Sequence, residues 1–257
     1  MIFESHAHYE SRQFDEDRDV LLDRFNENGI GYVVNVASSA ETTKQSLALA
    51  QKYPWIYASV GVHPSDIAEM DEQEFQWLTQ MCDHKKCVAV GEIGLDYYWD
   101  KEADVRENQR YWFRRQIELA KAKNLPIIVH SRDAAKDTMD IIKETDAASV
   151  GGVIHCFSNS VEFAKMYVDM GFYIGIGGVV TFKNAKVLKE VAAWTPLDRI
   201  LLETDCPYMA PVPYRGKRNS SLNLPYVAQA IADLKGISYE EVVCATYENA
   251  KRMYRID

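Results

Sequence analysis

The sequence lacks the features that mark several classes of protein. Its five cysteines include no CxxC pair and their number is odd, which predicts reduced thiols rather than a disulfide framework. No stretch approaches the roughly 18 consecutive apolar residues of a membrane helix. The first residues, MIFESHAH, also lack the basic and apolar regions of a signal peptide. We therefore expect a cytoplasmic protein without a membrane partner, and nothing in the sequence indicates an obligate protein partner.

Positive charge is also scarce. The chain has 29 Lys and Arg against 38 Asp and Glu, a formal net charge of −9 at pH 7. This balance argues against a broad electrostatic surface for duplex nucleic acid. The only tight basic cluster is Arg215, Lys217 and Arg218, in the stretch CPYMAPVPYRGKRNSSL (206–222). It could contact phosphates or be a solvated surface loop.

No linker rich in Pro, Gly or Ser divides the 257 residues, and 47% of them are hydrophobic, enough for one large core. Eight short apolar runs have the length of buried strands: 2–6, 32–37, 57–62, 87–92, 126–130, 152–156, 172–177 and 200–204. Eight strands alternating with helices predict a single α/β domain over 1–257, a TIM-type (β/α)8 barrel. The rival is an open doubly wound sheet, which usually has a glycine-rich loop after its first strand, and HAHYES is not one.

Helical spacing fills most of the intervals between these runs. The expected helical segments are 16–29, 42–53, 72–84, 107–124, 134–145, 161–171 and 185–195. The tail, 238–256, predicts one closing helix or two short ones. The longest connections, 97–107 and 206–222, both follow strands and would overhang the end of a barrel where active sites lie.

Five of the six histidines, and two acids, stand at or just past the carboxyl ends of the apolar runs. They are His6, His8, His63, His130 and His155, with Glu92 and Asp205. Any one of these histidines alone could be an ordinary core or surface residue, as we expect for His84. Their shared position instead predicts that they meet at one end of a barrel.

The side-chain types suit divalent metal ions. His6 and His8 lie two residues apart on a strand and should point the same way, toward one ion. Asp205 and Glu92 would complete that site, and His130 and His155 would complete a second one if Glu92 bridges. We thus expect two divalent ions per chain, Zn, Mn or Mg, held by His6, His8, Glu92, His130, His155 and Asp205.

Cysteine is a competing ligand type, because Cys156 and Cys206 directly follow His155 and Asp205. Strand alternation turns each of them to the face opposite its neighbour, toward the helix layer, where a thiol acts as a small apolar filler. We therefore leave both cysteines out of the expected ligand set.

Together these segments carry a family resemblance. The ordered motifs ESHAHYE, GVHP, GEIGLDYY, LPIIVHSR, IHCFS, LLETDCPYMAP, RGKRN and NAKRMY closely resemble the TatD family of metal-dependent hydrolases, from residue 2 to about 254. The resemblance implies an amidohydrolase-like barrel and hydrolysis of DNA phosphodiesters, often as a 3′-to-5′ exonuclease. It implies that His6, His8, Glu92 and Asp205 hold one metal, and that Glu92, His130 and His155 hold the other. It also implies that His63 faces the scissile phosphate.

Two positions depart from the family pattern. The family often has Asp two residues before the first histidine of the H-x-H pair, where this chain has Glu4. By strand parity Glu4 should face the same way as His6 and His8. The family also tends to follow RGKRN with Glu-Pro, where this chain has Ser220 and Ser221.

We expect a deoxyribonuclease that uses a metal-activated water. Glu92 and Asp205 are its catalytic residues, and Asp205 is both ligand and proton acceptor. The expected substrate is single-stranded or frayed DNA ends, bound by His63, Tyr97, Arg215, Lys217 and Arg218. Tyr97, Tyr98 and Trp99 could stack on bases or pack under a helix. The alternatives are an ester or amide hydrolase, such as a D-aminoacyl-tRNA deacylase, and an inactive metal-binding scaffold, which a complete ligand set argues against.

Overall fold

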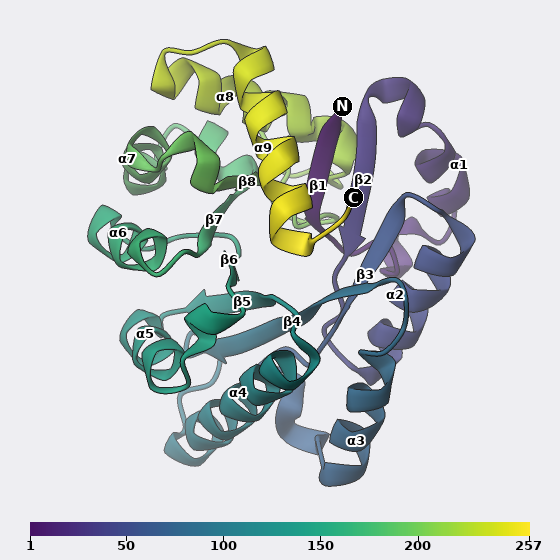
Figure 1. The fold of residues 1–257 in the computed structure, drawn as a ribbon. Coiled ribbons are helices and arrows are strands. Elements are labelled where there is room, and N and C mark those ends of the chain that lie inside the picture. The colour runs from purple at the N-terminus through teal and green to yellow at the C-terminus, as the bar shows by residue number, and fades with distance from the viewer.

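The computed structural model describes residues 1–257, and its centre is a ring of eight parallel strands surrounded by helices (Figure 1). The strands are β1 (Ile2–Ala7), β2 (Ile30–Asn35), β3 (Ile56–Val60), β4 (Cys87–Asp96), β5 (Ile127–Arg132), β6 (Gly152–Ile154), β7 (Tyr173–Ile176) and β8 (Ile200–Leu202). They pair in chain order from β1 to β8. This order confirms the predicted (β/α)8 barrel and excludes the doubly wound sheet.

The barrel closes between its first and last strands. The Ser5 hydroxyl donates to the Leu202 carbonyl over 2.8 Å. Beyond the end of β8, the Asp205 amide donates to the His6 carbonyl over 3.0 Å, and the His8 amide donates to the Cys206 carbonyl over 2.9 Å. These bonds join the two ends of the strand order, and Ser5 and Leu202 are 197 residues apart in sequence.

The helices alternate with the strands and cover the outside of the barrel. They are α1 (Arg18–Asp23), α2 (Ala40–Lys52), α3 (Glu72–Met81), α4 (Ala103–Lys123), α5 (Ala135–Glu144), α6 (Val161–Asp169), α7 (Lys186–Trp194), α8 (Leu224–Lys235) and α9 (Tyr239–Tyr254). Their apolar faces and the outward strand residues form a core cluster of 56 buried residues. No helix is long and apolar enough to span a bilayer.

Several elements differ from the sequence prediction. The helix expected over 16–29 is only α1, followed by a 3-10 turn at Asn26–Asn28, and β4 continues past the expected end at 92 to Asp96. Helix α4 starts at Ala103, inside the stretch 97–107 that we expected to be a loop. Helix α8 was not predicted, although Pro225 stands in its first turn and Gly236 ends it in a left-handed conformation (φ 66°). The tail is one helix, α9, which begins with a capping box between Ser238 and Glu241.

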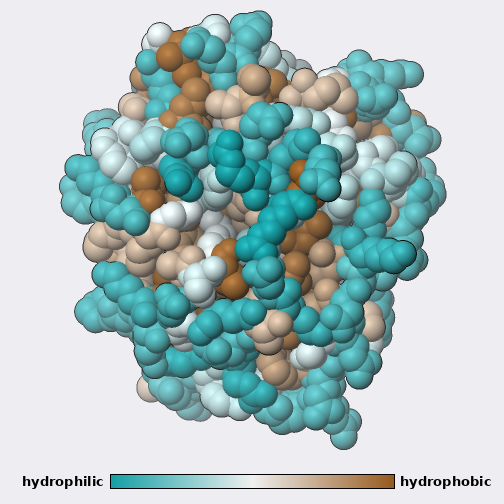
Figure 2. Space-filling model, viewed as in Figure 1, coloured by the Kyte–Doolittle hydropathy of each residue, from teal (hydrophilic) through white to brown (hydrophobic).

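A second, smaller core fills the barrel itself. Its 13 buried residues include Phe3 of β1, Ile128 of β5 and Leu201 of β8, together with Met253 and Tyr254 of α9. Strands from around the whole ring can share one cluster only inside the barrel. The Tyr254 hydroxyl also donates to the Ser5 carbonyl over 2.7 Å. Helix α9 therefore closes the amino-terminal end of the barrel, and the face on this side is largely hydrophilic (Figure 2). The site must open at the other end.

Candidate metal centre

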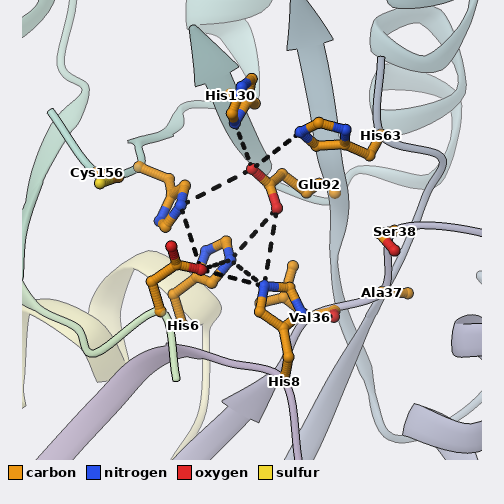
Figure 3. A network of polar contacts seen from close by, with 12 residues as sticks. His6, His8, Val36, Ala37, Ser38, His63, Glu92, His130 and Cys156 are labelled. Atoms are coloured by element: carbon orange, nitrogen blue, oxygen red, sulfur yellow. Dashed lines mark hydrogen bonds and ion pairs between the residues drawn. The ribbon is translucent and has the colours of Figure 1, made fainter. Parts of the chain in front are cut away.

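The carboxyl ends of the strands bring all seven predicted histidines and acids together (Figure 3). Glu92 on β4 lies in the middle, with His63 and His130 on one side and His6 and His8 on the other. Because parallel strands in a barrel end on one face, residues from six separate segments share this position.

One group of ligand atoms forms around the H-x-H pair. The Nε2 atoms of His6 and His8 are 3.1 Å apart. Asp205 Oδ1 lies 3.3 Å from His8 Nε2 and 3.9 Å from His6 Nε2. Ligand atoms about 2.0–2.2 Å from a tetrahedral ion are roughly 3.3 Å from one another, so these separations suit a single cation.

A second group forms on the other side of Glu92. Glu92 Oε1 lies 2.7 Å from His130 Nδ1 and 3.8 Å from the Nε2 atoms of both His63 and His155. The other oxygen, Oε2, lies 3.5 Å from His6 Nε2. One carboxylate thus presents one oxygen to each group, which is the arrangement of a bridging ligand. His155 Nε2 is also 3.9 Å from Asp205 Oδ1, so it lies between the groups.

Three of the histidines turn their outer ring nitrogen to an oxygen acceptor. His8 Nδ1 is 2.8 Å from the Val36 carbonyl, His130 Nε2 is 3.2 Å from Asp96 Oδ2, and His155 Nδ1 is 3.1 Å from Glu203 Oε2. A carbonyl or carboxylate only accepts, so each neutral ring holds its proton on the outer nitrogen. The inner nitrogen then offers a lone pair to the centre, as a metal-binding histidine does.

His63 has the opposite arrangement. Its outer nitrogen, Nδ1, accepts a hydrogen bond from the Ser65 backbone N–H over 3.1 Å. The neutral ring therefore holds its proton on Nε2, the atom that faces Glu92. By distance alone His63 groups with Glu92 and His130 as a possible ligand. The tautomer instead makes it a hydrogen-bond donor toward the centre.

The protonation of the ion-free site reflects its many carboxylates. Burial opposes charge on His130, but hydrogen bonds with Asp96 and Glu92 outweigh it and raise its pKa to about 9. Burial is likewise outweighed at His155, where Glu203 and Glu92 raise the pKa to about 9. Burial lowers the pKa of His63 to about 4, so this ring is neutral. Glu92 is also buried, yet the surrounding imidazoles hold its pKa well below the ordinary value.

The donor set fits divalent cations. The ligand atoms of His6, His8 and Asp205 lie within 4.8 Å of one another, as do those of His63, Glu92 and His130. Burial opposes charge on His8, but its hydrogen bonds with Asp205 and Glu10 outweigh it and raise its pKa well above the ordinary value. Its Nδ1 donates to the Val36 carbonyl, so the proton that a cation would displace is the one on Nε2, 3.3 Å from Asp205 Oδ1 and 3.1 Å from His6 Nε2.

The sequence profile of the family described as TatD related DNase matches residues 3–255. The chain belongs to this family. It is 45% identical to YabD, an uncharacterized metal-dependent hydrolase of Bacillus subtilis, over the whole of both chains. It is 36% identical to the Escherichia coli metal-dependent hydrolase YcfH, covering all of this chain and 96% of the relative. The crystal structure of YjjV, a TatD homolog from Escherichia coli, superposes with a TM-score of 0.93 at 32% identity, covering 100% and 98% of the two chains.

The two departures from the TatD pattern touch each other. The Ser221 hydroxyl donates to Glu4 Oε2 over 2.9 Å. The same buried carboxylate accepts from the Thr204 amide and hydroxyl and from the His6 amide. Glu4 was expected to face the same way as His6, but the pairing of β1 with β2 shifts register between Glu4 and Ala7. Its carboxylate therefore lies against Thr204, just after β8, and Ser221 rather than among the ligand atoms.

Cys156 also departs from expectation. Strand β6 ends at Ile154, and Cys156 has a left-handed backbone (φ 44°), so the alternation used to predict its orientation does not extend to it. Its Sγ lies within 4.8 Å of the ligand atoms of His155 and Asp205. Cys206, in contrast, is fully buried, as predicted.

A cavity of about 1390 Å³ opens over the site and continues across the loops after β1 and β2 toward α2. Of the cations predicted to contact substrate, none lines it. Arg218 is paired with Asp17, Arg215 lies over Phe182, and Lys217 lies near Tyr214. The cations that do line it come from other segments: Arg12, Arg18, Lys52 and Arg132.

The structure separates the three aromatic residues that could either stack on bases or pack under a helix. The Tyr97 hydroxyl donates to Asp137 Oδ2 over 2.8 Å and accepts from Arg110 over 2.9 Å, which ties it to α4 and α5. Trp99 lines the cavity and is 67% exposed. Sequence reasoning also missed Asp96 and Glu203, which orient His130 and His155, although both stand in the strand-end motifs GEIGLD and LLETD.

Proposed function

We propose that this TatD-family metal-dependent hydrolase cleaves phosphodiester bonds of DNA and removes nucleotides from single-stranded or frayed 3′ ends. The observation that carries the proposal is the position of Glu92, whose two oxygens face two separate groups of ligand atoms. A pair of divalent ions about 3.5–4 Å apart is the usual centre for in-line displacement at phosphorus.

In this proposal each group holds one ion. His6, His8 and Asp205 hold the first with Glu92 Oε2, and His130 and His155 hold the second with Glu92 Oε1. Zn, Mn and Mg all suit a mixed histidine and carboxylate set. When bound, the ions lower the pKa of water and neutralise charge on the phosphate.

Two side chains handle protons and charge around the phosphate. Asp205 Oδ1 lies 3.3 Å from His8 Nε2, so it is placed to accept the proton of the attacking water. His63 holds its Nε2 proton toward the centre because Ser65 donates to its other nitrogen. That N–H is a fixed donor for a phosphate oxygen, in the way oxyanion-hole donors act.

The surroundings of the site favour a single strand over a duplex. The chain carries a net charge of −9, and the cavity is lined by a few cations rather than by a broad basic face. Arg132 lies 4.0 Å over the Tyr98 ring, beside the exposed Trp99. An exposed indole next to a guanidinium is a surface on which an unpaired base can stack.

The test is a matrix of metals and substrates. Chelator-treated protein is reloaded with Zn, Mn or Mg and given single-stranded oligonucleotides labelled at the 5′ or the 3′ end, with carbonyl esters and D-aminoacyl-tRNA in parallel. We expect stepwise shortening from the 3′ end. Asp205→Asn should lower turnover by at least about 10³-fold with unchanged circular dichroism, and Asp198→Asn at the opposite end of the barrel should not. Preference for carbonyl substrates would replace the proposal with the deacylase alternative.

A further inference from the structure

A second cavity opens beside Asp205, above the end of β7. Its volume is about 300 Å³, and its walls come from the residues after β6, β7 and β8 and from the first turn of α7. Four of its lining residues, Cys156, Ser158, Asp205 and Met209, also line the large cavity. The two cavities therefore meet at the metal centre, and we call the smaller one the β7 pocket.

The walls of the β7 pocket are mainly apolar, with a polar rim. Phe157 is buried, with its ring edge-on to Tyr167 at 6.3 Å, and Leu188 is buried as well. Half-buried Val179 adds to this wall. Polar groups come from Ser158, Asn184 and Lys186, and from Glu203, Thr204 and Asp205 on the side of the metal centre. Small-molecule pockets commonly combine apolar walls with a few polar groups, in volumes of about 300–1,000 Å³. The β7 pocket is at the small end of that range, the size of one nucleoside rather than of a chain.

We propose that the β7 pocket binds the base of the terminal nucleotide, the one released by cleavage. This inference rests on the proposed nuclease function. The apolar faces of a flat heteroaromatic base can pack against Phe157, Val179 and Leu188. Its polar edge can form hydrogen bonds with Ser158 and Asn184. With the scissile phosphate at Asp205 and Glu92, the base on one side enters the β7 pocket.

The rest of the strand then lies in the large cavity. Trp99 follows β4, across the ring from the β7 pocket, and Arg12 lines the cavity beyond β1. The centre is thus flanked by a pocket for one base on one side and by an open cleft with an exposed indole on the other. This asymmetry suits removal of single nucleotides from an end, because the smaller cavity has room for only one residue of the strand.

To test this, larger side chains are introduced into the wall of the β7 pocket, and both product binding and oligonucleotide cleavage are measured. Val179→Phe and Ala185→Leu each add bulk at a half-buried position of its wall. Ala148→Leu, at an exposed position before β6 and at the opposite end of the barrel, is the matched control. Binding to metal-loaded protein is measured by calorimetry with 2′-deoxynucleoside 5′-monophosphate and with 2-deoxyribose 5-phosphate, which lacks the base.

For wild type and Ala148→Leu we expect the nucleotide to bind at least tenfold more tightly than the sugar phosphate, since base stacking and burial contribute about 1–3 kcal/mol. Both filling variants should remove this preference and keep the affinity for the sugar phosphate. In parallel, wild type should cleave an oligonucleotide at least tenfold faster than one with an abasic terminal residue.

The possible failures are distinguishable. Equal binding of the two phosphates by wild type, or an unchanged preference in both folded variants, would overturn the base pocket while leaving oligonucleotide cleavage intact. Absence of oligonucleotide cleavage by metal-loaded wild type would overturn the nuclease function, and the base pocket with it. Tight binding of acyl chains in place of bases would assign the pocket to a carbonyl substrate and contradict the inference.

Discussion

The Ser221 hydroxyl donates a hydrogen bond to Glu4 Oε2 over 2.9 Å, joining residues 217 positions apart. The Glu4 carboxylate is fully buried and also accepts from the Thr204 amide, the Thr204 hydroxyl and the His6 amide. It connects the strand that carries the H-x-H pair with the segment that leads into Asp205. The longer acid at position 4 and the serine at position 221 therefore act together, as one support behind the metal centre.

Ser221→Ala should lower the free energy of unfolding by about 1–3 kcal/mol, because it leaves a buried carboxylate with one donor fewer. Ser220→Ala is the matched control, since the hydroxyl of the half-buried Ser220 makes no hydrogen bond, and it should change stability by less than about 0.5 kcal/mol. Urea denaturation of metal-free protein measures both. Equal effects of the two substitutions would show that the Glu4–Ser221 contact contributes nothing.

Metal affinity should rise with pH between about 6.5 and 9. In the ion-free protein the pKa values of His130 and His155 are raised to about 9, so both rings are protonated at neutral pH and a cation must displace those protons. Each proton released contributes up to about tenfold in affinity per pH unit until the pH passes the raised pKa. The raised pKa values of His130 and His155 also stabilise the fold of the ion-free protein. This stabilisation is fully present below about pH 6.5 and is lost as the pH rises through about 9.

Calorimetric titration of zinc at pH 7, in buffers with different ionisation enthalpies, counts the released protons. We expect between one and two protons per chain from this pair, and a further contribution from His8, whose pKa is raised well above its ordinary value because hydrogen bonds with Asp205 and Glu10 outweigh burial. A titration in which the measured heat does not depend on the buffer would contradict the account of His130 and His155.

Trp99→Ala should weaken binding of a single-stranded oligonucleotide by about 5- to 150-fold, the range that corresponds to 1–3 kcal/mol of stacking. Tyr97→Phe should leave binding unchanged and reduce stability instead, because the Tyr97 hydroxyl bonds to Asp137 and Arg110 rather than lining the cavity. Fluorescence anisotropy with Asp205→Asn as the inactive background measures both. If Tyr97→Phe weakened oligonucleotide binding and Trp99→Ala did not, Tyr97 rather than Trp99 would be the residue that stacks on a base.

Arg12→Ala should weaken oligonucleotide binding and reduce the slope of log K against log salt by about 0.7, the value for one lost phosphate contact on a single strand. Arg12 is exposed, lines the cavity and makes no ion pair. Arg218→Ala should leave that slope unchanged, because its guanidinium is paired with Asp17 at 2.5 Å. Salt titrations of binding compare the two. A smaller slope only in Arg218→Ala would restore the basic loop as the phosphate contact.

The barrel and the central residues could be predicted because both follow from local pattern. The apolar runs that lead into Glu92 and His130 identify β4 and β5, although these strands continue to Asp96 and Arg132. Parallel strands of a barrel end on one face, so the residues near their carboxyl ends meet. Positions that depend on irregular backbone could not be predicted in this way. The register shift after Glu4 and the left-handed backbone of Cys156 both break the two-residue alternation on which strand parity depends.

Contacts between loops that are distant in the chain also could not be predicted from the sequence. The pairing of Arg218 with Asp17 joins the segment after β8 to the start of α1, and only the fold shows that this cation is already satisfied. The roles of Asp96 and Glu203 depend on which ring nitrogen of His130 or His155 faces inward. Residue type and spacing do not encode that choice.

In the proposed mechanism Glu92 bridges two ions, and both ions are needed to cleave a phosphodiester. The most direct test titrates chelator-treated protein with manganese or zinc, measuring bound metal and cleavage of a 3′-labelled single-stranded oligonucleotide on the same samples. We predict that activity rises until two equivalents of metal are bound per chain and then stays constant. Full activity at one equivalent, or two bound ions with no cleavage of the oligonucleotide, would contradict the account.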